Sequence, residues 1–259
     1  MEYNLTTLQP VLPEIVLLTA ACLILLIDLF LSDRTRLLTY GLTLAALLST
    51  IAATQYVAGP VREIILDGSF VRDPMSDVLK TGLLLVSLFA FVYAKDYLKE
   101  LGILRGEYYV LGLFAVLGMM VMISANSFLT VYLGLELLAL CMYALVAFHR
   151  DSRTGAEAAM KYFVLGALAS GMLLYGMSML YGLSGSLNIA EVAEAVAAAD
   201  EVRQQNEKFS PERALDGNPD TYWAVDDDVR EATLTLSLPD TATFDRLLLQ
   251  EPIRLGQRI

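Results

Sequence analysis

Six long apolar stretches occupy most of the first three quarters of this 259-residue chain. A helix needs roughly 20 apolar residues to cross the hydrocarbon of a bilayer, and most of the stretches are near that length. Lipid offers the backbone no hydrogen-bond partners, so segments that cross it are expected to be helices. We therefore predict an all-α polytopic membrane protein with about six transmembrane helices. The expected spans are Pro10–Leu31, Leu37–Tyr56, Ser76–Ala94, Tyr108–Ile123, Ser127–Phe148 and Ala158–Leu183.

The charge content changes near residue 195. Charged side chains make up 14% of residues 1–195 and 31% of residues 196–259. We predict a transmembrane helix bundle over 1–189, a linker over 190–205 and a short, incomplete β-rich segment over 206–259. The net charge is −11 and the chain has no basic stripe, which excludes nucleic acid as a partner.

Lysine and arginine are concentrated in alternate loops between the predicted spans. Cytoplasmic loops of membrane proteins carry an excess of these residues, so the first, third and fifth loops are predicted to be cytoplasmic. The N-terminus and the tail from residue 184 would then lie on the outer, periplasmic side. The odd loops hold Arg34, Arg36, Lys95, Lys99, Arg105, Arg150 and Arg153, whereas the even loops hold only Arg62 and Arg72.

Glu136 is the strongest candidate for a functional residue. It lies near the middle of the fifth span, where an ionisable group costs on the order of 3 kcal/mol. Tyr132 and Tyr143 are four residues before it and seven after it, so all three share one helix face. A carboxyl beside two phenols can hold and pass a proton. The alternative is a protonated glutamate that only hydrogen-bonds a neighbouring helix.

Other ionisable groups are expected nearer the membrane surfaces. Lys161 opens the sixth span, where it either extends to the cytoplasmic surface or serves as a charge partner in a proton path. Asp28 and Lys80 are predicted to be interfacial, and His149 is predicted to lie at the cytoplasmic surface.

The same sequence predicts no metal or nucleotide chemistry in this chain. It has one histidine, no phosphate-binding loop, no dinucleotide fingerprint and no nucleophile triad. Cys22 and Cys141 lie inside apolar runs and are predicted to be small buried hydrophobes. Two rows of small residues in the sixth span, Gly166 with Ser170 and Ala167 with Gly171, predict close helix contacts.

Several stretches of the first part resemble one known family. The stretches are Leu12–Glu14, Leu26–Leu29, Leu133–Leu138, Met160–Gly171 and Leu174–Gly176. Together they closely resemble the N subunit of bacterial proton-pumping NADH:quinone oxidoreductase, respiratory complex I.

The resemblance implies a partial antiporter-like bundle in the membrane arm, in the bacterial inner membrane. Glu136 matches the family's mid-membrane glutamate, and Lys161 matches the lysine that opens its sixth helix. The family couples quinone reduction to proton transfer, so the chain is expected to act as a subunit and not as a catalyst alone. The resemblance implies no cofactor in this chain, because NADH, flavin, iron–sulfur and quinone sites are expected in partner subunits. Family members have many more helices than are predicted here, so this chain is not expected to pump alone.

The tail resembles a different family. Ala214–Ala224, Phe244–Glu251 and Leu255–Arg258 resemble the discoidin-like (factor V/VIII type C) module of family 29 α-L-fucosidases. That resemblance implies a glycan as a partner and a weak calcium site at Asp216 and Asn218. The module is expected to be incomplete, because two or three strands leave bare edges and little core.

Three hypotheses about function remain open on the sequence. The chain is a shortened membrane-arm subunit, a membrane-anchored carbohydrate-binding protein, or a composite reading frame in which neither function is complete. A subunit of a multisubunit cation/proton antiporter shares the same helix pattern, and spacing alone barely separates it from the first hypothesis.

Overall fold

The computed structural model describes residues 5–31 and 36–197 of the chain. Six of the described helices are long and apolar enough to cross a membrane, which confirms the predicted all-α polytopic fold. They are α1 (Leu12–Asp28), α2 (Arg36–Val57), α3 (Pro74–Glu100), α4 (Gly106–Ile123), α5 (Phe128–Val146) and α6 (Arg153–Ser184).

Smaller elements flank these helices. A 3-10 helix, η1 (Leu5–Val11), precedes α1, and a β-hairpin of β1 (Glu63–Ile65) and β2 (Phe70–Arg72) joins α2 to α3. The sequence analysis missed this hairpin, because strands of three residues are too short to show an alternating pattern.

The hairpin is tied to the loop between α4 and α5. The backbone N–H of Val71 donates to the carbonyl of Ser124, and the N–H of Asn126 donates to the carbonyl of Ser69. The amide of Asn126 also donates to the carbonyl of Gly68, in the hairpin turn. These bonds hold β2 across the end of the bundle.

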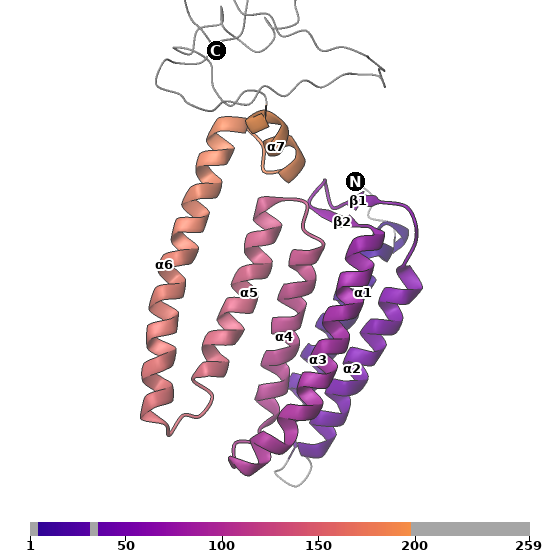
Figure 1. Ribbon diagram of the computed structural model, residues 1–259. Helices are drawn as coiled ribbons and strands as arrows, with labels where there is room; N and C mark the ends of the chain where they lie inside the picture. The colour runs from indigo at the N-terminus through magenta and orange to yellow at the C-terminus, as the bar shows by residue number, and fades with distance from the viewer. Residues whose placement is uncertain (1–4, 32–35, 198–259) are drawn as a thin grey trace, which may run out of the picture. The chain divides into compact units, whose positions relative to one another are not determined.

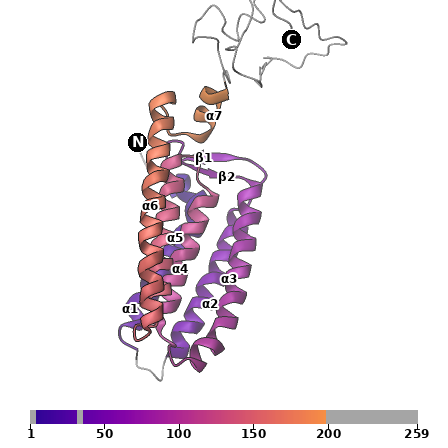
Figure 2. The same cartoon turned by 60° about the vertical axis from the view of Figure 1, so that its left-hand side comes forward.

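Helices α1 to α4 pack around a common apolar core, and α4 is the most buried of the six (Figures 1 and 2). Each of the four contributes side chains with no exposed surface. These are Leu17, Leu47, Leu84, Leu113 and Met120.

Helices α5 and α6 lie outside this core. α5 packs on α4, and α6 packs on α5 at the edge of the bundle (Figure 1). In the most apolar 18-residue stretch of each helix, only 11% of α5 and 6% of α6 is buried. Their remaining apolar side chains are therefore available to lipid or to other protein.

Polar caps set the helix ends beyond the apolar runs. α3 begins at Pro74, because the Asp73 side chain accepts from the backbone N–H of Ser76 and the Ser76 hydroxyl accepts from that of Asp73. α6 begins at Arg153, where the Ser152 hydroxyl accepts from the N–H of Gly155. Hydropathy alone placed both starts too late.

The two cysteines differ in burial. Both are free thiols; Cys141 is buried as predicted, whereas Cys22 is exposed on the surface of the bundle. The prediction was wrong for Cys22, because that residue lies outside the buried stripe of α1 formed by Leu17, Ala21 and Ile24.

The chain divides into two compact units, Met1–Ile189 and Ala190–Ile259. Of the second unit, the structure describes only a short helix, α7 (Ile189–Ala197), which starts at the end of the first unit. The predicted β-rich segment over 206–259, with its calcium ligands Asp216 and Asn218, lies outside the described residues.

Two glycines let α4 and α5 approach closely. A Cβ on Gly118 would lie 2.7 Å from the carbonyl oxygen of Gly134, and a Cβ on Gly134 would lie 2.7 Å from that of Gly118. Both neighbours are backbone atoms that cannot move without shifting a helix. The contact therefore fixes the spacing of the two helices.

We expect Gly118→Ala to destabilise the bundle by about 1–3 kcal/mol, because the added methyl group forces α4 and α5 apart. Thermal unfolding in detergent measures the loss. The control is Gly41→Ala on α2, where a Cβ would meet nothing within 4 Å. There alanine should be neutral or slightly stabilising, since it favours a helix over glycine. Equal stability of the two variants would contradict the close contact.

Candidate functional site

The polar groups relevant to function lie in two places within the described bundle. One is the contact between α5 and α6, around Glu136. The other is the hairpin end of α1 and α3, around Glu14 and Lys80.

Glu136 and Tyr132 meet on the side of α5 that faces α6. The Ser170 hydroxyl of α6 donates a hydrogen bond to Oε1 of Glu136. The same hydroxyl lies 3.1 Å from the phenol oxygen of Tyr132. All three side chains are half-buried. A carboxyl, a phenol and a hydroxyl in continuous contact form a short chain of groups through which a proton can move.

Tyr143 occupies a different position on the same contact. Its hydroxyl lies against Gly166, where a Cβ would collide with it. Its ring packs edge-on against Tyr162 and Phe163, with centroids 4.9 and 5.5 Å away. The predicted row of Gly166 and Ser170 thus faces α5. Gly171, from the other predicted row, has no described atom within 4 Å of a Cβ.

Lys161 does not join Glu136 in the described part of the chain. Its ammonium lies 2.7 Å from Oε1 of Glu157, one turn away, and both side chains are largely exposed. An exposed pair of this kind contributes little to stability. Lys161 is also nine positions before Ser170 on α6, or about 13 Å along the helix. Its role in proton transfer stays a prediction.

The surface residues lie near the ends of the bundle. His149 is exposed in the loop between α5 and α6. Asp28, in the last turn of α1, accepts a hydrogen bond of 2.6 Å from the Thr39 hydroxyl of α2.

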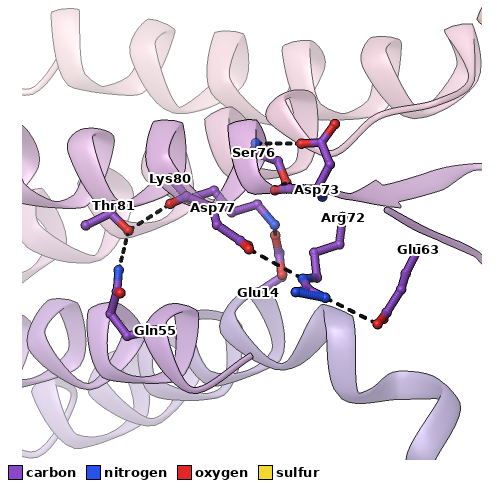
Figure 3. Close-up of polar contacts among 9 residues, drawn as sticks. All are labelled: Glu14, Gln55, Glu63, Arg72, Asp73, Ser76, Asp77, Lys80 and Thr81. Atoms are coloured by element: carbon purple, nitrogen blue, oxygen red, sulfur yellow. Dashed lines mark hydrogen bonds and ion pairs between the residues drawn. The ribbon is translucent and has the colours of Figure 1, made fainter. Parts of the chain in front are cut away.

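The second site is a buried ion pair that the sequence analysis did not identify. The Lys80 ammonium of α3 lies 2.5 Å from Oε1 of Glu14 on α1 (Figure 3). The side chains are only 1% and 6% exposed. The ammonium also lies 5.0 Å from the centre of the Phe70 ring. Lys80 is therefore buried inside the bundle, and its interfacial depth in the membrane stays a prediction.

Further charges adjoin this pair. Arg72 of β2 is shared between two carboxylates, with its Nε 3.4 Å from Asp77 and its Nη1 3.3 Å from Glu63 (Figure 3). Arg72 and Asp77 are buried, while the Glu63 side chain is 45% exposed. We call the five residues Glu14, Glu63, Arg72, Asp77 and Lys80 the hairpin-end cluster.

A signal for this pair was present in the sequence. Glu14 and Lys80 are ionisable residues inside predicted spans that have few others. They have opposite charge and lie near the N-terminal ends of α1 and α3, which run in the same direction. The hairpin that covers this end was not predicted, and only Lys80 of the two was given a predicted position.

Within residues 5–31 and 36–197, no group of three or more histidine, cysteine, aspartate or glutamate side chains could hold a metal ion.

We expect Ser170→Ala to lower the stability of the bundle by about 1–2 kcal/mol, because Glu136 and Tyr132 both lose their contact with the hydroxyl. The matched control is Ser178→Ala on the same helix, whose hydroxyl donates only to the carbonyl of Tyr175. Unfolding in detergent compares the two. A loss for Ser170→Ala no larger than that for Ser178→Ala would show that the contact between helices is not formed.

Comparison with known proteins supports an antiporter-like fold. Residues 125–211 match the family model described as NADH:quinone oxidoreductase/Mrp antiporter, TM. Respiratory complex I from Thermus thermophilus with bound Aureothin contains a similar chain. It is 27% identical with a TM-score of 0.58, over 72% of this chain and 44% of that one. A chain of the Mrp complex from Dietzia sp. is 24% identical with a TM-score of 0.52, over 75% and 39%, which shows the fold alone.

Curated relatives are closer in sequence. NADH-quinone oxidoreductase subunit N of Thioalkalivibrio sulfidiphilus is 52% identical over 194 residues, which is 75% of this chain and 40% of that protein. The subunit N of Thiobacillus denitrificans is 51% identical over 203 residues, 78% of this chain and 42% of that protein. The chain thus spans about two fifths of the length of these relatives. It is a multi-pass membrane protein with an antiporter-like fold, similar over three quarters of its length to NADH-quinone oxidoreductase subunit N.

Proposed function

We propose that the chain is a membrane-arm subunit of a proton-translocating NADH:quinone oxidoreductase and contributes to the proton transfer coupled to quinone reduction. Identity above 50% to subunit N supports this assignment. The observation that carries it is the contact of Glu136 with Ser170, which Tyr132 shares. A titratable carboxyl inside an apolar bundle marks a functional site by default, since burying it is costly.

Glu136 is the central proton-transfer residue in this proposal, and Tyr132 is its neighbour in the proton chain. Tyr143 lies farther along the same helix contact. Lys161, with Glu157, would act nearer the surface of the bundle. These roles rest on the chemistry of the side chains and on the contacts described above.

The reaction would require partner subunits. NADH, flavin, iron–sulfur and quinone sites would lie in those partners, and other membrane-arm subunits would contact this chain. The exposed apolar side chains of α5 and α6 support such contacts. The host membrane would be the bacterial inner membrane, with the hairpin end and the N-terminus on the periplasmic side, as the loop charges suggest.

A subunit of a multisubunit cation/proton antiporter is the second candidate. The likeness of fold to a chain of the Mrp complex favours it. Carbohydrate binding receives no such support, and residues 206–259, to which it was assigned, lie outside the described part of the chain.

We expect Glu136→Gln to reduce the protons moved per NADH oxidised while electron transfer to quinone continues. Losing a positioned proton-transfer group slows such a step on the order of 100-fold or more. The measurement follows NADH oxidation and proton uptake together in inverted membrane vesicles of the host. The matched control is Glu100→Gln, which removes an exposed carboxyl at the end of α3.

The control variant should keep the wild-type ratio of protons to electrons. An unchanged ratio in Glu136→Gln would contradict the proposed role of this residue. A different outcome would favour the antiporter assignment over the oxidoreductase assignment. In that outcome, the proton uptake that depends on this chain is driven by a sodium gradient and not by NADH oxidation.

A further inference from the structure

An open pocket of about 480 Å³ reaches the hairpin-end cluster from the side of α2 and α3. Its lining includes Asp77, Gln55 and Thr81. The Gln55 amide donates to the Thr81 hydroxyl at 2.9 Å, and that hydroxyl donates to the backbone carbonyl of Asp77. The pocket is polar at this wall and far larger than the roughly 30 Å³ that one water occupies in the liquid. Water can therefore approach Asp77 and deliver protons there.

The hairpin-end cluster has one carboxylate more than it has cations. Its acids are Glu14, Glu63 and Asp77, and its bases are Arg72 and Lys80. Fully ionised, the cluster carries one surplus negative charge. A surplus charge in a largely buried group of side chains is costly, and binding one proton removes it.

Glu14 is the acid best placed to take that proton. Its carboxyl is buried, and Oε2 has no hydrogen-bond partner among the described residues. A protonated Glu14 is neutral, so it no longer requires the Lys80 ammonium as a counter-charge. Asp77 is three positions before Lys80 on α3, a spacing at which an acid and a base of one helix can pair. Arg72 would keep Glu63 as its partner.

The cluster therefore has two arrangements, which differ by one bound proton. In the arrangement observed, Lys80 pairs with Glu14, and Arg72 is shared by Asp77 and Glu63 (Figure 3). In the other, Glu14 is protonated, Lys80 pairs with Asp77, and Arg72 pairs with Glu63 alone. The change forms one O–H bond on Glu14 with a proton supplied by water and transfers no electrons.

We propose that the hairpin-end cluster is a second proton-binding site of this chain. Glu14 takes up one proton, and the Lys80 ammonium changes its ion-pair partner from Glu14 to Asp77. This deepens the proposed function by adding a site at which protons enter or leave the bundle. It does not involve Glu136.

Among the described residues near this end, the other ionisable groups do not pair with Lys80, and Asp67 is exposed in the hairpin turn. On α2, the last turns hold only Tyr56, which is exposed. Arg62 donates to the side chain of Asn126, and Asp73 caps α3. η1 has no ionisable residue, and those of α4 all lie in its first turn, at the opposite end.

Infrared titration of the purified full chain in lipid nanodiscs tests the proposal. The carbonyl stretch of a protonated carboxylic acid is followed as the pH is changed. A Glu136→Gln background removes the contribution of the half-buried carboxyl on α5. We expect a titrating buried-acid band that disappears in Glu14→Gln. It should also disappear in Asp77→Asn, which retains Glu14 but offers Lys80 no second carboxylate.

The matched control is Glu100→Gln, which should keep the band. If Glu14→Gln does not fold, the double variant Glu14→Gln/Lys80→Gln removes both charges together and should also lack the band. A band that persists without Glu14, or the absence of any titrating band in the background protein, would overturn the proposal. The measurement detects proton binding and not transport, so it can fail while the Glu136→Gln pumping test succeeds, or the reverse.

Discussion

A charge inside an apolar helix bundle has to be met by another group of the protein, because neither lipid nor the core can solvate it. This constraint organises the hairpin end of the chain. Lys80 on α3 is met by Glu14 on α1, and Asp77 is met by Arg72 from the hairpin. The hairpin is in turn bonded to the backbone around Ser124. Segments far apart in the sequence are thereby joined through one set of charges.

The two polar sites have different surroundings. The hairpin-end cluster is enclosed by α1, α3 and the hairpin, while Glu136 lies between the two least buried spans, α5 and α6. A half-buried carboxyl at mid-span is poorly suited to lipid. Contact with further protein, such as the partner subunits proposed above, would complete its environment.

The sequence predicted the spans well, and with them the place of Glu136 near the middle of α5, because both depend on long stretches of hydropathy. It predicted helix ends less well, since α3 and α6 begin at the polar caps Asp73 and Ser152, outside the apolar runs. The burial of Lys80 against Glu14 was missed because the hairpin that covers this end of the bundle was not predicted, and three-residue strands give no periodic signal.

The position of α4 limits how the two sites can communicate. α4 packs between the α1–α3 side and α5, and its ionisable side chains all lie in the first turn, away from the hairpin. Its central residues are apolar or glycine, including Leu113 and Gly118, so they provide no groups for proton transfer across the helix. Protons held at Glu136 and at Glu14 would therefore exchange through separate routes. The pocket beside Asp77 lies between α2 and α3, on the side of the second site and not of the first.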